Sequence, residues 1–202
     1  LALKQAGLPL PCGAVAISPW TDLTCSGESY RTKGKVSVAP AESWTVFSRH
    51  YVADNDPSNP LISPLFGDLA GLPPLLINSA VDDELFDDGE SFASKARASG
   101  VEVTFRRGVG MVHCYPLLAP MFPEATQAMD EIVAFMRARL SRACSSGDRS
   151  ASVLRTSVTP GTLFMAATIL FDRSIRVFIS GPLIDTFSAA PNPTPMNPAV
   201  VN

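Results

Sequence analysis

The chain has few of the residues that mark a metal-dependent or nucleic-acid-binding protein. It has only two histidines, and its four cysteines, Cys12, Cys25, Cys114 and Cys144, lie far apart with no Cys-x-x-Cys spacing. This spacing favours free thiols in a reducing compartment over a zinc site or a disulfide framework. A formal net charge of −3 at pH 7 gives no reason to expect nucleic acid or an anionic lipid surface as partner.

The chain also lacks an apolar run long enough to cross a membrane. Its best candidate, residues 162–179, is interrupted by the charged residues Asp172, Arg173 and Arg176. Each half is far shorter than the roughly 20 residues that a spanning helix needs, so we expect two short strands or a collapsed tail there. No basic segment leads into an apolar run near Leu1, so no signal peptide is visible, which favours a cytoplasmic location.

The order of the remaining apolar segments predicts an α/β fold with about three parallel strands and flanking helices. With 202 residues, 46% of them hydrophobic, the chain can build one globular domain with a core. Strands alternate with helices, and this alternation is typical of a parallel sheet. The expected strands are Gly13–Ser18, Leu75–Ala80 and Val101–Arg106, and the main expected helices are Leu85–Ala98 and Pro123–Leu140.

Residues 40–52 have the spacing of a further helix, with Trp44, Phe47 and Tyr51 on one side. We expect Trp44, like Trp20, to pack in the core or a loop and not to contact substrate. His50 on the same segment is predicted to be a surface or partly packed residue. Asp22 could either brace a loop near a site or form a local Asx turn.

Acidic residues at the end of one predicted strand and a histidine after the next suggest a catalytic pair. Asp82 and Asp83 follow the strand Leu75–Ala80, and His113 follows the next strand in a glycine-containing loop. This is the order of acid and base in a Ser…Asp…His triad. Taken alone, the aspartates could instead cap the following helix, and His113 could be an ordinary loop histidine.

The nucleophile of such a triad is not found in these 202 residues. The strained turn that carries it requires glycine two residues before and two residues after the serine. Ser29 and Ser91 have the glycine on the N-terminal side alone, and no other serine comes closer to the pattern. Neither histidine is followed by glycine, so the His-Gly-Gly oxyanion-hole signature is absent as well.

Five motifs follow one another in the order Ser18–Tyr30, Asp56–Phe66, Leu72–Ile77, Asp83–Asp87 and Gly110–His113. In this order they resemble the hormone-sensitive-lipase-like family of α/β-hydrolases, the carboxylesterases and lipases of the α/β-hydrolase fold-3 group. The resemblance implies that residues 1–140 are the C-terminal portion of that fold. The tail, residues 141–202, shows no such resemblance, and we expect it to have little order.

The resemblance implies a role for each member of the pair. His113 would be the general base and then the general acid, and Asp83 would orient its ring and stabilise the imidazolium. Asp83 is preferred to Asp82 because the family's acid lies four residues before a second acid, here Asp87; Asp82 remains an alternative. The family's Gly-Asp-Ser-Ala-Gly and His-Gly-Gly-Gly segments would precede Leu1. No metal or cofactor is implied, because the triad and backbone amides carry out the chemistry.

The sequence therefore predicts a carboxylic-ester hydrolase that acts on small acyl esters and is represented by its C-terminal portion, with these 202 residues inactive by themselves. The alternative is a non-catalytic truncated relative that binds a small ligand or a protein. In either case the apolar edge of the first strand would lack a neighbour and could mediate self-association. A third possibility is a gene fragment whose function belongs to a longer product.

Overall fold

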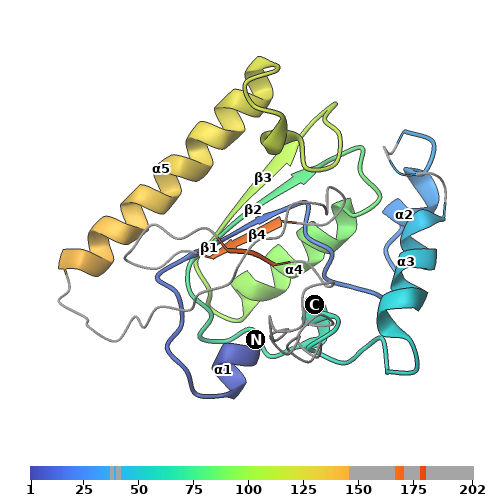
Figure 1. Cartoon of the computed structure of the whole chain (residues 1–202), viewed down its shortest axis with the longest axis horizontal. Coiled ribbons are helices and arrows are strands. Elements are labelled where there is room, and N and C mark those ends of the chain that lie inside the picture. The colour runs from blue at the N-terminus through green and yellow to red at the C-terminus, as the bar shows by residue number, and fades with distance from the viewer. Residues whose placement is uncertain (37–38, 40–41, 146–166, 171–177, 181–202) are drawn as a thin grey trace, which may run out of the picture.

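The computed structural model describes residues 1–36, 39, 42–145, 167–170 and 178–180. The strands β1 (Ala14–Ile17), β2 (Leu75–Ala80) and β3 (Val103–Gly108) are parallel, and β2 lies between the other two (Figure 1). This arrangement confirms the predicted α/β fold with three parallel strands and flanking helices.

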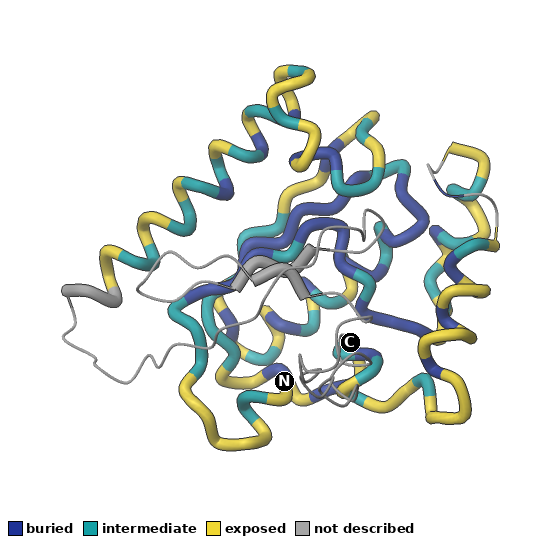
Figure 2. The backbone as a smooth tube through the Cα atoms, in the orientation of Figure 1, coloured by how far each residue is buried: buried dark blue, intermediate teal, exposed yellow. Residues whose placement is uncertain are grey.

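Helices cover both faces of the parallel strands and explain why β2 is buried along its whole length (Figure 2). Successive residues of a strand point to opposite faces. Leu75 and Ile77 pack on one face against α4 (Phe86–Ala98), whereas Leu76 packs on the other face against Ile132 of α5 (Pro123–Ser145). A parallel strand enclosed in this way is apolar without alternation, which is the pattern that predicted it.

Shorter helices connect these elements. They are α1 (Ala2–Gln5), α2 (Ser29–Thr32), α3 (Ser43–Val52) and the 3₁₀ helices η1 (Pro64–Phe66) and η2 (Tyr115–Leu118). α5 is five residues longer than predicted, since no glycine or proline follows Leu140 before Gly147. None of the helices in the described ranges combines the length and the apolar character that a bilayer-spanning segment requires.

The helix α3 buries one row of its side chains and leaves the aromatic residues Phe47 and Tyr51 at the surface. Trp44, Ser48 and Val52 are buried, whereas Phe47 and Tyr51 are exposed. The Ser48 hydroxyl donates a hydrogen bond to the backbone carbonyl of Leu23, which brings a polar residue onto the buried side. The helix therefore packs along a row with four-residue spacing, and its aromatic residues are divided between core and surface.

The described part of the tail adds two strands to the sheet, β4 (Ala167–Leu170) and β5 (Phe178–Ser180). β4 pairs antiparallel with β1, and β5 pairs antiparallel with β4. Two short strands are one of the alternatives that the pattern of residues 162–179 predicted. The edge of β1 that was expected to be unpaired is therefore covered. The low order expected elsewhere in residues 146–202 falls outside the described residues.

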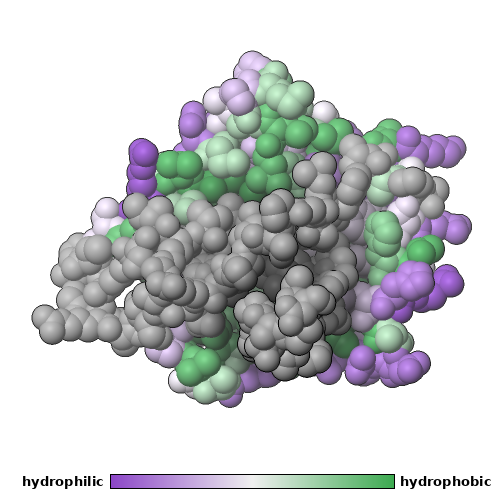
Figure 3. Space-filling model, in the orientation of Figure 1, coloured by the Kyte–Doolittle hydropathy of each residue, from purple (hydrophilic) through white to green (hydrophobic). Residues whose placement is uncertain are grey.

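Exposed apolar side chains gather where η2 meets the start of α5, at the top of the view in Figure 3. Leu117, Leu118 and Met121 are exposed there. Below them, Tyr115 and Ala125 are buried and pack with Ala80 of β2. This small cluster fixes the N-terminal end of α5 beside the carboxyl ends of the strands.

Candidate active site

Asp83 and His113 meet at the carboxyl ends of two neighbouring parallel strands. Asp83 lies in the turn between β2 and α4, and His113 lies in the loop after β3. Their Nδ1 and Oδ2 atoms are 2.7 Å apart, and the side chains are only 8% (His113) and 1% (Asp83) exposed. The sequence analysis named this pair as candidate catalytic residues, and the structure brings them together beyond the carboxyl ends of the strands, where sites of α/β sheets form.

The structure separates the two aspartates that the sequence left as alternatives. The Asp82 carboxylate is 41% exposed and lies 3.5 Å from the Lys33 ammonium. It is Asp83 that faces the imidazole. The second oxygen of Asp83 also accepts a hydrogen bond from the backbone N–H of Leu85, at 3.3 Å, so the helix-start contact and the histidine contact are made by the same side chain.

The surroundings of His113 favour its charged form. Burial alone lowers the pKa of His113, but the hydrogen bond and negative charge of Asp83, with a contribution from Cys114, raise this pKa to about 10. The other ring nitrogen, Nε2, is buried and has no hydrogen-bond partner within the described part of the chain. In a Ser-His-Asp triad this nitrogen exchanges a proton with the serine.

Close backbone contacts fix the loop that carries His113. The backbone N–H of Cys114 donates a 3.0 Å hydrogen bond to the hydroxyl of Ser18, at the end of β1. Gly110 has φ +69°, a conformation that favours glycine, and a Cβ added to Gly108 would lie 2.4 Å from the ring of Tyr115. The glycines on either side of Val109 therefore meet a steric requirement of the loop.

A buried carboxylate that the sequence analysis missed joins the acid-bearing turn to the segment after β1. The carboxylate of Asp88 accepts hydrogen bonds from the backbone N–H groups of Thr21 and Asp22, each at 2.7 Å, and from the hydroxyl of Tyr30 at 2.9 Å. Burial raises the pKa of Asp88 to about 7, although these hydrogen bonds act in the opposite direction.

Asp22 itself forms the local turn that was one of its two predicted roles. Its carboxylate accepts hydrogen bonds from the backbone N–H of Thr24 at 2.8 Å and from the hydroxyl of Ser26 at 2.5 Å. Asp87 adds a further link, since its carboxylate accepts a 2.8 Å hydrogen bond from the backbone N–H of Ser29. Asp87 and Asp88, in the first turn of α4, thus tie residues 21–30 to the helix that follows Asp83.

Trp44 lies directly against His113. The two ring centroids are 5.2 Å apart with an angle of 50° between the ring planes. Trp44 is 3% exposed, in agreement with the prediction of a packed aromatic residue. Its contact with the candidate base was not predicted, because residues 44 and 113 belong to different elements and share no motif.

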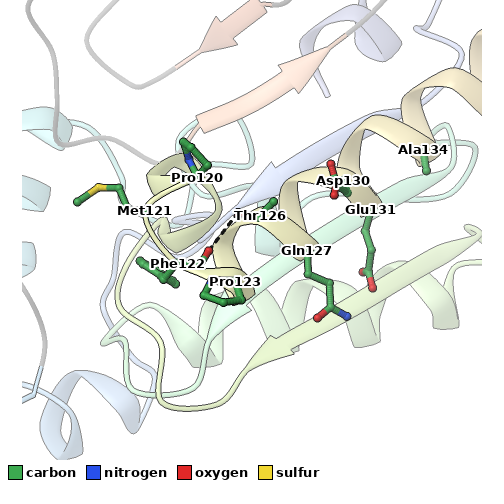
Figure 4. A pocket seen from close by; sticks show the side chains of 9 residues that line it. All are labelled: Pro120, Met121, Phe122, Pro123, Thr126, Gln127, Asp130, Glu131 and Ala134. Atoms are coloured by element: carbon green, nitrogen blue, oxygen red, sulfur yellow. Dashed lines mark hydrogen bonds between the residues drawn. The ribbon is translucent and has the colours of Figure 1, made fainter.

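An open hollow of about 880 Å³ lies elsewhere on the molecule, against the first turns of α5 (Figure 4). Its lining includes Met121, Phe122 and Gln127, but neither Asp83 nor His113. It is therefore separate from the candidate active site. The described residues contain no group of three or more His, Cys, Asp or Glu side chains that could hold a metal ion.

Comparison with known proteins gives consistent relatives. The family described as alpha/beta hydrolase fold matches residues 1–117. The chain is 40% identical over 137 residues to an acetyl-hydrolase of Streptomyces hygroscopicus, covering 67% of this chain and 46% of the relative. It is 37% identical over 137 residues to an esterase of Acinetobacter venetianus, covering 67% and 45%.

Solved structures show the same likeness. The crystal structure of EstE5, soaked with p-nitrophenyl butyrate, matches with a TM-score of 0.65 and 36% identity over 68% of this chain and 47% of that chain. A hormone-sensitive lipase from a metagenome library matches with a TM-score of 0.65 and 34% identity, covering 68% and 48%. The chain thus spans about half the length of the relatives it matches.

Proposed function

The chain belongs to the α/β-hydrolase fold family, and from this premise we propose that it is the acid- and base-bearing part of a carboxylic-ester hydrolase. The observation that carries the proposal is the 2.7 Å contact between Asp83 and His113, both buried beside the carboxyl ends of β2 and β3. The acetyl-hydrolase and esterase among the relatives favour small acyl esters as substrates.

In the proposed reaction His113 moves a proton and Asp83 keeps the ring in place. In its neutral form, which becomes more populated as the pH rises toward the pKa of His113, Nε2 takes the proton of a serine hydroxyl during attack on the ester carbonyl and then gives it to the leaving alcohol. Asp83 accepts the hydrogen bond from Nδ1–H, which leaves Nε2 as the reacting nitrogen and stabilises the imidazolium. The proposed chemistry requires no metal and no cofactor.

The proposal assigns the serine and the oxyanion-hole donors to a segment outside these 202 residues, since no serine within them has the required glycines. Without the serine no acyl-enzyme can form, and without the oxyanion hole even the residual rate that survives triad deletion is lost. The described residues therefore supply the proton-transfer pair and the scaffold that orients it.

Hydrolysis of p-nitrophenyl butyrate tests the proposal with two proteins, the 202-residue chain and the product of any longer reading frame that includes codons before Leu1. We expect the 202 residues to give no more than the buffer rate. The longer product should turn over at about 1 to 10³ per second and lose this activity on His113→Ala. Turnover by the 202 residues that survives His113→Ala would refute the proposal.

A non-catalytic role is the second candidate, favoured by the absence of a nucleophile-type serine from the chain. In that case the protein would bind a ligand or a partner protein without cleaving an ester. The DNA before the codon for Leu1 distinguishes the two functions. A Gly-x-Ser-x-Gly sequence in frame supports the hydrolase, whereas a start codon with no such sequence after it supports the binding module.

A further inference from the structure

We propose that Trp44 is a positioning residue for His113, which holds the imidazole in line with Asp83 and favours its positively charged form. The importance of this contact for catalysis rests on the proposed function. The contact itself does not, because its effect on the titration of His113 can be measured in the absence of any reaction.

Two contacts of different kinds define the position of the imidazole. Asp83 binds the ring at Nδ1, 2.7 Å away, and this single hydrogen bond still allows the ring plane to tilt through the side-chain torsions. Trp44 removes that freedom, since its ring centroid lies 5.2 Å from that of His113 with an interplanar angle of 50°. The hydrogen bond and the aromatic contact together select one orientation for Nε2.

The indole also acts on the charge of the imidazole. The face of an aromatic ring attracts a cation within about 6 Å of its centre, and tryptophan does so most strongly. The pKa of His113 is raised to about 10 although burial lowers it. The titratable groups that act on His113 within the described residues are Asp83 and Cys114. The indole, 5.2 Å away between ring centroids, would add an attraction that does not itself titrate.

Trp44 is well fixed for this role. It packs edge-on against Trp20, with centroids 5.1 Å apart, and against Phe47, with centroids 6.1 Å apart. Its Nε1 atom is buried and makes no hydrogen bond to any described residue. Trp44→Phe therefore removes ring area without breaking a hydrogen bond, and it isolates the aromatic contact.

The first test is an NMR titration of the full 202-residue chain in a His50→Gln background, which leaves His113 as the sole histidine. We expect Trp44→Leu to lower the midpoint of His113 by about 0.5 to 1 pH unit, and Trp44→Phe to lower it less. Trp20→Leu is the matched control, since Trp20 packs against Trp44; it should cause a smaller shift.

The direction of this shift decides between two roles for Trp44. If the indole only shielded the imidazole from water, its removal would relieve the burial that disfavours the charged form, and the midpoint would rise. A rise, or no change, in a folded Trp44→Leu protein would overturn the proposal. If Trp44→Leu lowers the midpoint but the longer product does not hydrolyse the ester, the contact with Trp44 stands and the proposed function is wrong.

A second test does not require a Trp44 substitution. The chain has two tryptophans, so Trp20→Phe leaves Trp44 as the only indole. A protonated imidazole in contact with an indole quenches its fluorescence. We expect the emission to rise through the same pH range in which the NMR signal of His113 titrates, and the inflection to vanish in His113→Gln. A constant emission across that range would overturn the proposal.

Discussion

The Nδ1 atom of His113 lies 2.7 Å from Oδ2 of Asp83, although 30 residues separate them in the chain. The parallel arrangement of β2 and β3 creates this contact, because both strands end at the same edge of the sheet. The helix between them returns the chain to the opposite edge. The contact between Asp83 and His113 therefore arises from the strand topology and from side chains at two adjacent strand ends.

Asp83→Asn should destabilise the protein and lower the pKa of His113. The buried imidazolium loses its charged partner, and breaking a buried pair in this way costs about 3 kcal/mol. Urea denaturation at pH 6 measures the loss. Asp82→Asn is the matched control, since Asp82 makes an exposed pair with Lys33 that contributes less than about 1 kcal/mol. Equal losses in both variants would contradict the assignment of Asp83.

The contribution of His113 to stability should fall as the pH rises. Its pKa is raised to about 10 in the folded chain from an ordinary value of 6.5. The resulting stabilisation is fully present below pH 6.5 and is lost as the pH rises toward 10. We expect the difference in unfolding free energy between wild type and His113→Gln to shrink from pH 6 to pH 10. A difference that stays constant over this range would exclude the predicted titration.

The strands and main helices could be predicted because their signals are local. Continuous apolar runs predict β1 and β2, and three- and four-residue spacing predicts α5. The pairing of Asp83 with His113 followed from strand order and from the resemblance to a known family. The Trp44–His113 contact could not be predicted, because no periodicity or spacing indicates that the helix carrying Trp44 packs on the loop carrying His113. The burial of Ser48 on α3 could not be predicted for a similar reason, because its hydrogen bond to the Leu23 carbonyl depends on tertiary structure.

Asp88→Ala should loosen the segment after β1. Three donors, the backbone N–H groups of Thr21 and Asp22 and the hydroxyl of Tyr30, lose their acceptor, and buried donors left without a partner cost about 1 to 3 kcal/mol each unless water reaches them. Hydrogen exchange of the Thr21 and Asp22 amides should accelerate. Asp56→Ala is the control, because among the described residues the exposed Asp56 carboxylate bonds to the nearby Ser58 alone. Unchanged exchange in Asp88→Ala would refute the bracing role.

Gly89→Ala should destabilise the protein, and Ser79→Ala should rescue it. A Cβ on Gly89 would lie 2.1 Å from the hydroxyl oxygen of Ser79, an overlap that costs about 1 to 3 kcal/mol. Removing that oxygen relieves the severe overlap, leaves the Cβ of residue 79 at 3.2 Å from the new Cβ, and leaves alanine, a better helix former than glycine by about 1 kcal/mol. Thermal unfolding of the two single variants and the double variant should give a clear coupling energy. Additive effects would show that the two residues do not collide.

Removal of residues 146–202 should cause the remaining protein to self-associate. β4 pairs with β1 along Ala14–Ile17, so its loss exposes a row of unpaired backbone groups on an apolar strand, and such an edge pairs readily with another chain. Light scattering after size-exclusion chromatography should show dimers or larger species whose amount grows with protein concentration.

Ile169→Pro in the full chain is a milder variant, since proline removes a backbone donor from β4. It should produce the same species to a smaller extent. If the shortened protein stays monomeric at high concentration, the β4 pairing does not protect this edge, and the self-association predicted for an uncovered β1 is wrong.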